Sequence, residues 1–345
     1  MSETTIPPAA AIWIRRWLIL VGLMVYAMIL IGGATRLTDS GLSITEWDPI
    51  KGALPPLSAE AWNEAFAKYR ETAEYRYINH GMSMSEFQHI YWWEWGHRFF
   101  GRMIGLVAVL GIALFAIRKW LTRPLLWKLL GLVALGGLQG AIGWWMVSSG
   151  IGETTRVDVA PYRLMTHFML ALLIIAIVAW LWLDLGQRER HAVSGAMRLT
   201  AKVLLVAIFV QMAAGALVAG LDAGRSYNDW PLMAGELVPS HYLEGDLGLR
   251  SLFEGRAATQ FNHRILAYAI WAASLVAAFM YRKTAYGRSF IVLAGLVSLQ
   301  AVWGIFTLLH AAPMNLALLH QGIGVVVTLA AVRLAWLTAR PVASA

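Results

Sequence analysis

Four of the nine histidines lie inside, or at the mouth of, long apolar segments of the sequence: His97 and His167 in the first half, His263 and His320 in the second. Polar side chains are costly in a membrane and usually functional there. Two imidazoles per half are too few for zinc, which takes three or four ligands. Two suffice for a haem iron, because the porphyrin supplies the other four ligands. A single membrane histidine is as often structural, but two pairs predict two bis-histidine haem sites.

Arginine residues accompany two of these histidines. Arg98 follows His97, Arg102 lies one helical turn further on, and Arg264 follows His263. A guanidinium group pairs well with carboxylates such as haem propionates. We therefore predict that the three arginines contact propionates, the alternative being that they extend towards the membrane interface.

The residue three positions before each of these histidines differs between the halves. Glu94 precedes His97, whereas Gln260 precedes His263. Residues three apart share a helix face, so both side chains should lie near the haem edge. A carboxylate can accept a proton or stabilise a developing cation, and an amide does neither well. The first site is therefore predicted to perform chemistry and the second to hold a redox cofactor; the alternative is that Glu94 only pairs with Arg98.

The remaining histidines carry a weaker signal. His80 and His89 fall in one long polar loop, His241 in another and His191 in a short basic segment. We interpret these four as solvated surface residues. His310 ends an apolar segment at the depth of the four paired histidines, so it could be an alternative ligand or a group behind one.

The composition indicates a membrane protein. Of the 345 residues, 59% are hydrophobic and 14% charged, whereas soluble domains carry about 25% charged residues. The absence of cysteine excludes disulfides, iron–sulfur clusters, thiolate-ligated haem and cysteine-based zinc sites. The net charge of +8 is typical of basic cytoplasmic loops, so we expect no nucleic-acid partner.

Eight apolar runs are long enough to span a bilayer, which takes about 20 residues. They cover roughly residues 15–34, 98–117, 125–147, 164–184, 200–220, 264–281, 288–309 and 315–336. The fold class is thus predicted to be an all-α membrane protein with eight transmembrane helices. Cytoplasmic loops are enriched in Lys and Arg, and placing both termini in the cytoplasm puts 15 of the 28 such residues in short inner segments. These are Arg15, Arg16, Arg118, Lys119, Arg123, Lys128, Arg188, Arg190, Arg198, Lys202, Arg282, Lys283, Arg288, Arg333 and Arg340.

Four matches in chain order indicate an internal duplication. Gly41–Trp47 corresponds to Gly224–Trp230, Glu94–Arg98 to Gln260–Arg264, Leu138–Gly143 to Leu299–Gly304, and His167 to His320. We therefore predict two pseudosymmetric four-helix bundles. Residues 1–190 would carry an outer loop over 35–96, and residues 191–345 an outer loop over 221–262.

The first outer loop contains an amphipathic stretch. Ser58 is a candidate helix N-cap, and we predict that Trp62, Phe66, Tyr69 and Tyr77 follow it on one side. This stretch would lie on the membrane surface, cap a site or pack as a surface helix. A capping box of Ser85 and Gln88 predicts that the next helix starts before the membrane and runs continuously through Glu94.

Several of these motifs together resemble the haem A synthase family. They are the run Thr35–Ser43, the Glu46-Trp47 pair with Pro49, Glu94–Arg98 and Asn262–Arg264. The similarity extends from about residue 13 to 336 and is closest to the mitochondrial and alphaproteobacterial type. Some members carry a cysteine pair in the outer loops; this chain has none, so electrons must leave without a thiol step.

This resemblance implies an oxidoreductase that converts the C8 methyl of haem O to a formyl group, giving haem A for cytochrome c oxidase. His97 and His167 would bind the substrate haem, with Glu94 as the catalytic acid, while His263 and His320 would ligate a haem b cofactor. It also implies a bacterial inner-membrane location, and haem O synthase and the oxidase assembly machinery as partners beside membrane lipid; a homo-oligomer stays open. The competing interpretations are a quinol-linked di-haem b cytochrome and a non-enzymatic haem carrier or assembly factor.

Overall fold

The computed structural model describes residues 6–186 and 191–339, and regular structure within these stretches is almost entirely helical. Eight of the described helices are long and apolar enough to cross a membrane, which confirms an all-α, multi-pass membrane protein. They are α1 (Pro8–Leu37), α4 (Met84–Ile117), α5 (Arg123–Val147), α6 (Pro161–Asp184), α7 (Gly195–Gly220), α9 (Arg256–Tyr281), α10 (Gly287–Leu309) and α11 (Met314–Thr338). Of the basic residues used to orient the chain, Arg188, Arg190 and Arg340 lie outside the described stretches.

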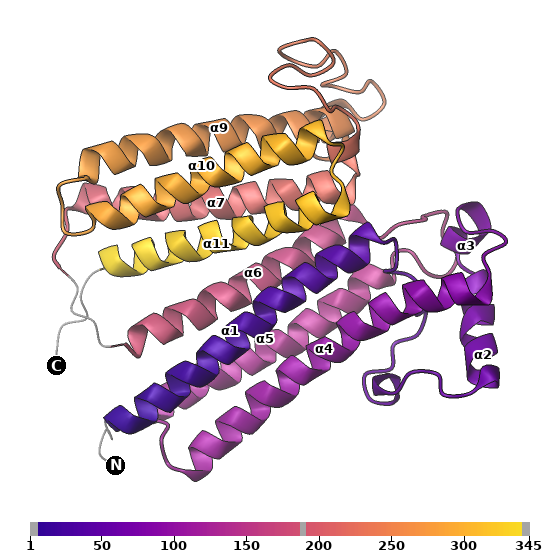
Figure 1. Cartoon of the computed structure of the whole chain (residues 1–345), viewed down its shortest axis with the longest axis horizontal. Helices are drawn as coiled ribbons and strands as arrows, with labels where there is room; N and C mark the ends of the chain where they lie inside the picture. Colours follow the sequence, from indigo (N-terminus) through magenta and orange to yellow (C-terminus); the bar gives the residue numbers. More distant parts are fainter. Residues whose placement is uncertain (1–5, 187–190, 340–345) are drawn as a thin grey trace. The chain divides into compact units, whose positions relative to one another are not determined.

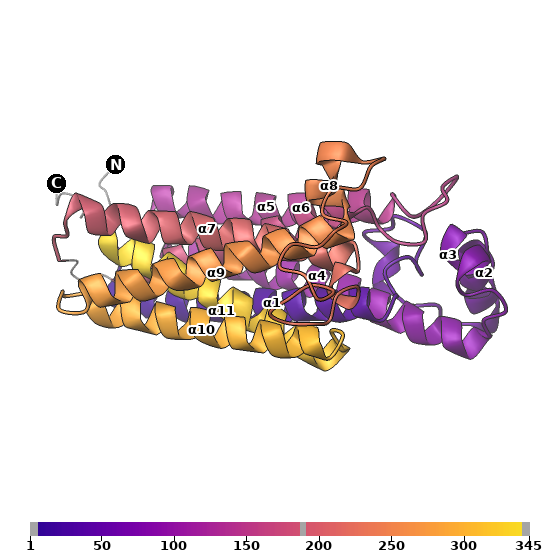
Figure 2. The ribbon, with the colours of Figure 1, turned by 90° about the horizontal axis from the view of Figure 1, so that it is seen from above.

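The chain divides into two compact units, Met1–Ile174 and Ile175–Ala345, with the boundary inside α6. In the second unit α7, α9, α10 and α11 form a closed four-helix arrangement, in which each helix packs against two of the others (Figures 1 and 2). Buried apolar side chains from all four helices form its core: Leu204, Ile208, Ile270, Leu293, Val297 and Leu334. The predicted division at residue 190, and the pseudosymmetry of the two halves, stay predictions.

In the first unit α4 packs along both α1 and α5. Because lipid chains are as apolar as leucine, helices in a bilayer associate through close packing and polar contacts. Both occur between α1 and α4. The Trp17 indole lies directly on Gly111, where there is no room for a Cβ atom, and its Nε1 donates to the carbonyl of Val107 at 3.1 Å.

The first long loop folds onto the start of α4. It contains a short 3-10 helix η1 (Lys51–Ala53), α2 (Ala59–Arg70) and α3 (Ala73–Tyr77). Ser58 caps α2 as predicted, accepting a hydrogen bond from the amide of Ala61. Trp62, Phe66 and Tyr69 pack against Phe87, Ile90 and Tyr91 of α4. The helix α2 is therefore a packed surface helix. The prediction that Tyr77 lies on the same side is wrong, because Tyr77 belongs to α3 and 66% of its surface is exposed.

The start of α4 corrects a second detail. The helix does begin well before the apolar run and continues through Glu94, as predicted. Its capping box, however, is formed by Ser83 and Glu86, two residues earlier than the predicted pair of Ser85 and Gln88. The backbone amide of Ser83 donates to the Glu86 carboxylate at 2.8 Å and the amide of Glu86 to the Ser83 hydroxyl at 3.3 Å, so the box satisfies two amides at the start of α4.

The second long loop is irregular. It contains η2 (Ala223–Arg225), η3 (Gly248–Arg250) and the single-turn helix α8 (Ser251–Glu254) before α9 begins. The Asp229 carboxylate accepts hydrogen bonds from the amides of Ala234 and Gly235, which holds a turn at the middle of the loop. This turn matters for the site because the carbonyls around it face an arginine of α9.

Candidate haem sites

The four paired histidines lie on four different helices: His97 on α4, His167 on α6, His263 on α9 and His320 on α11. Their rings lie deep among surrounding atoms, although each side chain keeps a partly accessible surface. His97 and His167 both belong to the first compact unit, and His263 and His320 to the second. Each unit therefore contains one predicted pair of imidazoles.

Each of these rings rests on a glycine of a neighbouring helix. A Cβ atom at Gly32 of α1 would lie 3.0 Å from Cε1 of His97, and one at Gly143 of α5 would lie 2.8 Å from that of His167. The same arrangement joins Gly215 of α7 to His263 at 3.1 Å and Gly304 of α10 to His320 at 2.8 Å. Atoms rarely approach a real Cβ so closely, so these four glycines give the imidazoles the space that they occupy.

A glutamine four residues before the glycine accompanies three of the rings. Gln139 Nε2 lies 3.2 Å from Nδ1 of His167, Gln211 Nε2 lies 3.1 Å from Nδ1 of His263, and Gln300 Nε2 lies 3.4 Å from Nε2 of His320. Each of these amides also donates to the backbone carbonyl of the same histidine, at 3.0 to 3.1 Å. The glutamine therefore ties the histidine-bearing helix to its neighbour at the level of the ring.

These donor sets suit haem better than a bare metal ion. Within residues 6–186 and 191–339, no three His, Asp or Glu side chains come together in a way that could hold an ion. Two imidazoles are what a porphyrin-bound iron needs in each unit. Several polar atoms at the sites are buried without a hydrogen-bond partner in the described part of the chain: Nδ1 of His97 and His320, and Oε1 of Gln139, Gln211 and Gln300. Buried polar atoms are normally satisfied, so these atoms indicate groups that a ligand completes.

Glu94 is buried one turn before His97, with 3% of its surface exposed. One carboxylate oxygen accepts from Arg98 at 2.6 Å, and the other accepts from the Ser43 hydroxyl and the Ile44 amide, both at 2.8 Å. Arg98 also donates to the carbonyls of Ile44 and Glu46. The ion pair between Glu94 and Arg98, which the alternative interpretation predicted, is therefore present. It connects α4 to the loop that follows α1.

The corresponding position in the second unit carries a neutral amide. Gln260 is 2% exposed and donates to the carbonyls of Ala223 and Tyr227. Arg264 donates to Gln260 Oε1 at 3.1 Å and to three backbone carbonyls of the second loop, those of Tyr227, Asp229 and Leu232. The second unit therefore repeats the arginine bonding of the first, but Gln260 donates to its loop where Glu94 accepts from its own.

The three predicted propionate ligands are held by loop carbonyls. Arg102 donates to the carbonyls of Asp48 and Pro49, both at 2.9 Å, as Arg98 and Arg264 do to their own loops. Two nitrogen atoms, Nη1 of Arg102 and Nε of Arg264, are buried and have no partner among the described residues. Contact with propionates stays a prediction for all three arginines.

The chain is similar to known proteins over almost its whole length. A family model described as a cytochrome oxidase assembly protein matches residues 15–332. A haem A synthase of Hyphomonas neptunium is 67% identical over 341 residues, which cover 99% of this chain and 97% of the relative. The chain belongs to the haem A synthase family.

Other relatives carry the same name. The haem A synthase of Bradyrhizobium diazoefficiens is 48% identical over 325 residues, covering 92% of this chain and 89% of the relative. That of Caulobacter vibrioides is 46% identical over 332 residues, covering 94% and 96%. Membership of the haem A synthase family implies a haem-binding oxidoreductase, and neither the electron-transfer cytochrome nor the haem carrier receives support.

The remaining histidines of this haem A synthase family member are all exposed: His80, His89, His191, His241 and His310. His310 follows the last residue of α10, and its Nδ1 lies 2.8 Å from the carbonyl oxygen of Phe306.

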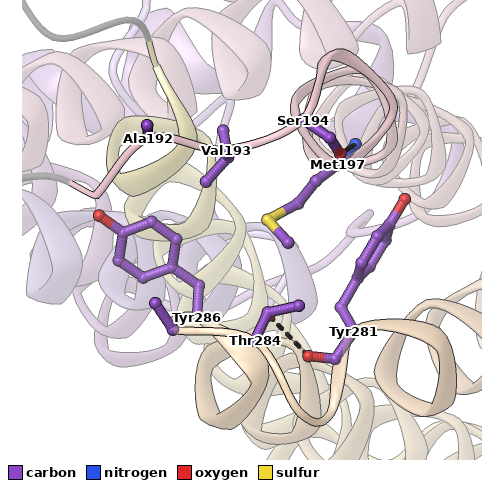
Figure 3. Close-up of a pocket in the computed structure, with 8 residues that line it drawn as sticks. Ala192, Val193, Ser194, Met197, Tyr281, Thr284 and Tyr286 are labelled. Atoms are coloured by element: carbon purple, nitrogen blue, oxygen red, sulfur yellow. Dashed lines mark hydrogen bonds between the residues drawn. The ribbon is translucent and has the colours of Figure 1, made fainter.

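A cavity of about 300 Å³ lies between the start of α7 and the turn that joins α9 to α10 (Figure 3). Tyr281, Tyr286 and Met197 line it together with Thr284, Ala285 and residues 192–194. The Tyr286 hydroxyl accepts from the amide of His191. The cavity is therefore lined by the helix ends of the second unit and is not part of the histidine site.

Sequence reasoning missed three of the seven residues that hold the rings: Gly32, Gln211 and Gly215. It named Gln139, Gly143, Gln300 and Gly304 without assigning any of them to a histidine ring. The repeated Gln-x-x-x-Gly spacing at residues 139, 211 and 300 is a signal that could have found them.

Proposed function

We propose that the first unit binds haem O between His97 and His167 and oxidises its C8 methyl group to a formyl group, giving haem A. The family and its relatives' name support this reaction. The second unit would hold haem b between His263 and His320. When bound, haem b supplies one-electron transfer that carries electrons away from the reaction.

The difference between Glu94 and Gln260 carries this assignment of the two units. Both side chains are buried one turn before a histidine, and both bond to an arginine four residues later. Only Glu94 has a charge that can take up a proton or stabilise a developing cation. The unit with the carboxylate is therefore the one proposed to act on its haem.

Converting a methyl group and one water molecule into a formyl group releases four electrons and four protons. We assign to Glu94 the acceptance of a proton, either from the attacking water or from the methyl carbon. Two successive two-electron oxidations would give first the alcohol and then a gem-diol, which loses water. Arg98, Ser43 and Ile44 fix the carboxylate in place throughout.

The remaining assignments follow from the same proposal. Arg98, Arg102 and Arg264 would face the propionates, to which the two unpaired buried nitrogens of Arg102 and Arg264 could donate. The protein would lie in the bacterial inner membrane with both termini in the cytoplasm, because the basic residues concentrate in the short segments on that side. Haem O synthase would supply the substrate and the cytochrome c oxidase assembly machinery would receive the product.

Replacing Glu94 with Gln tests the proposal. We expect Glu94→Gln to retain both haems and to lose formation of the aldehyde, because the amide keeps the shape of the side chain without its charge. The full-length protein would be produced with haem O, and its haems extracted and identified by mass. Glu64→Gln, at an exposed glutamate of α2, is the control for the loss of a carboxylate, and it should leave product formation in place. Normal production of haem A by Glu94→Gln would refute the role of Glu94.

A further inference from the structure

The four imidazoles do not have equivalent neighbours. Gln139, Gln211 and Gln300 each stand four residues before a glycine that contacts a histidine ring. The amide of each glutamine contacts the same ring and donates to the backbone carbonyl of that histidine. The fourth such position, four residues before Gly32, is Met28. One ring of the four, that of His97, therefore lacks a glutamine.

Met28 cannot replace the amide. Its thioether has no hydrogen to donate and is only a weak acceptor. Its methyl group packs instead one turn beyond His97, where a Cβ atom built on Gly101 would lie 3.3 Å from it. The Nδ1 atom of His97, like that of His320, is buried and has no hydrogen-bond partner among the described residues. At His320, however, the amide of Gln300 lies 3.4 Å from the other ring nitrogen, Nε2.

The missing amide matters because an iron-bound imidazole carries a hydrogen on its second nitrogen. Metal-bound histidines almost always donate this hydrogen to an acceptor, which fixes the ring and makes it a stronger ligand. At the other three rings the amide is already in contact, and its Oε1 is buried and unpaired. A small movement of the ring along the amide would let Oε1 accept the hydrogen while Nε2 keeps its bond to the histidine carbonyl.

We propose that Gln139, Gln211 and Gln300 are positioning residues that strengthen three iron–histidine bonds, and that Met28 leaves the His97 bond weak so that it opens to admit and release the substrate haem. This inference rests on the proposed function. A cofactor has to stay bound, and both of its histidines have a glutamine. A substrate has to leave after each reaction, and the single exception falls in its unit. His167, backed by Gln139, would hold the substrate haem while the His97 side opens.

The test restores the glutamine and removes it elsewhere. Met28→Gln, Gln139→Met and Gln211→Met would be made in the full-length protein, with Met28→Leu as a control that alters packing without adding an acceptor. The rate of haem loss would be measured by transfer to excess apomyoglobin, with each lost haem identified by mass. The reduction potential of each haem would be recorded as a second readout.

We expect Met28→Gln to slow the loss of haem O and haem A by roughly tenfold, the lower end of the usual effect of such partners on metal affinity. It should also lower the potential of that haem, because a more basic ligand favours ferric iron, and leave haem b unchanged. Gln211→Met should speed the loss of haem b by a similar factor, and Gln139→Met that of haem O. Met28→Leu should resemble the unmodified protein.

Three results would overturn the inference. An unchanged rate of haem loss in Met28→Gln would show that His97 is not the exchangeable ligand. Retention of haem b by this variant would show that it has folded. Equal rates of haem loss in all variants would show that the glutamines are not positioning residues. In both cases, formation of haem A by the unmodified protein would still support the proposed function. An unmodified protein that binds no substrate haem would refute the proposed function itself, and this inference with it.

Discussion

At the scale of single residues, the sites depend on the missing side chains of four glycines as much as on the histidines themselves. Each imidazole occupies the space beside a glycine where any other residue would place its Cβ atom. Ring and glycine must therefore be matched across a helix pair, and the closest approaches, 2.8 Å, occur at Gly143 and Gly304. Such contacts leave the ring little room to move without shifting a helix.

Adding one methyl group at Gly304 should displace a haem ligand. The new Cβ would lie 2.8 Å from Cε1 of His320, so the ring has to turn away. We expect Gly304→Ala to weaken haem b binding by about tenfold or more, as do other changes that misplace a ligand. Haem content per chain, measured after purification, gives the result.

Gly295 provides the control on the same helix, since a Cβ atom there would meet no other atom within 4 Å. Gly295→Ala should retain haem b in full. Full haem b content in Gly304→Ala as well would show that the ring tolerates the methyl group.

At the scale of elements, the first loop does more than connect α1 to α4. Its helix α2 packs an aromatic cluster on the start of α4, where the rings of Phe66 and Phe87 stack with centroids 4.8 Å apart. The preceding segment provides Ser43 and Ile44 to Glu94. The loop thus fixes the carboxylate from outside the helix that carries it.

The stability of this loop should depend on pH through Glu74 of α3. The side chain is 4% exposed, and burial raises its pKa to about 8, with Glu94, Asp158 and Asp39 adding to the rise and the hydrogen bond with Tyr69 opposing it. The folded loop therefore holds a proton that an unfolded chain would release near pH 4.5. This contribution is complete below that pH, falls as the pH rises towards 8, and stays low above it.

Hydrogen exchange of the α2 and α3 amides, corrected for the intrinsic effect of pH, measures this dependence. Protection should decrease between about pH 5 and 8 in the unmodified protein. Glu74→Gln should flatten the profile, because the amide does not titrate. A profile that is identical in both proteins would exclude Glu74 as its source.

Hydropathy predicted the eight spanning helices of the described residues, because it depends on local sequence alone. Details that depend on tertiary packing were harder. Tyr77 shares its aromatic character with Trp62 but sits in a separate short helix, and Ser83 and Ser85 are equally good caps on sequence alone. Gly32 lacks a glutamine four residues before it, because Met28 stands there, so no local pattern shows its contact with His97.

At the scale of the whole molecule, each compact unit contains one complete pair of imidazoles. Replacing His263 and His320 together with Ala should therefore remove haem b and leave the haem of the first unit bound. Optical spectra of the purified protein would show the loss of one six-coordinate signature, and extraction would identify the missing haem. A pigment content that does not change would refute the assignment of the second unit.

The bonds from Gln139, Gln211 and Gln300 to the histidine carbonyls join backbone to side chain and need no iron to form. The helices can consequently reach their final register in the bilayer before haem binds. Pigment would then enter a finished scaffold and leave it intact. A single polypeptide could in this way serve many porphyrin molecules during its lifetime, with no need to refold between them.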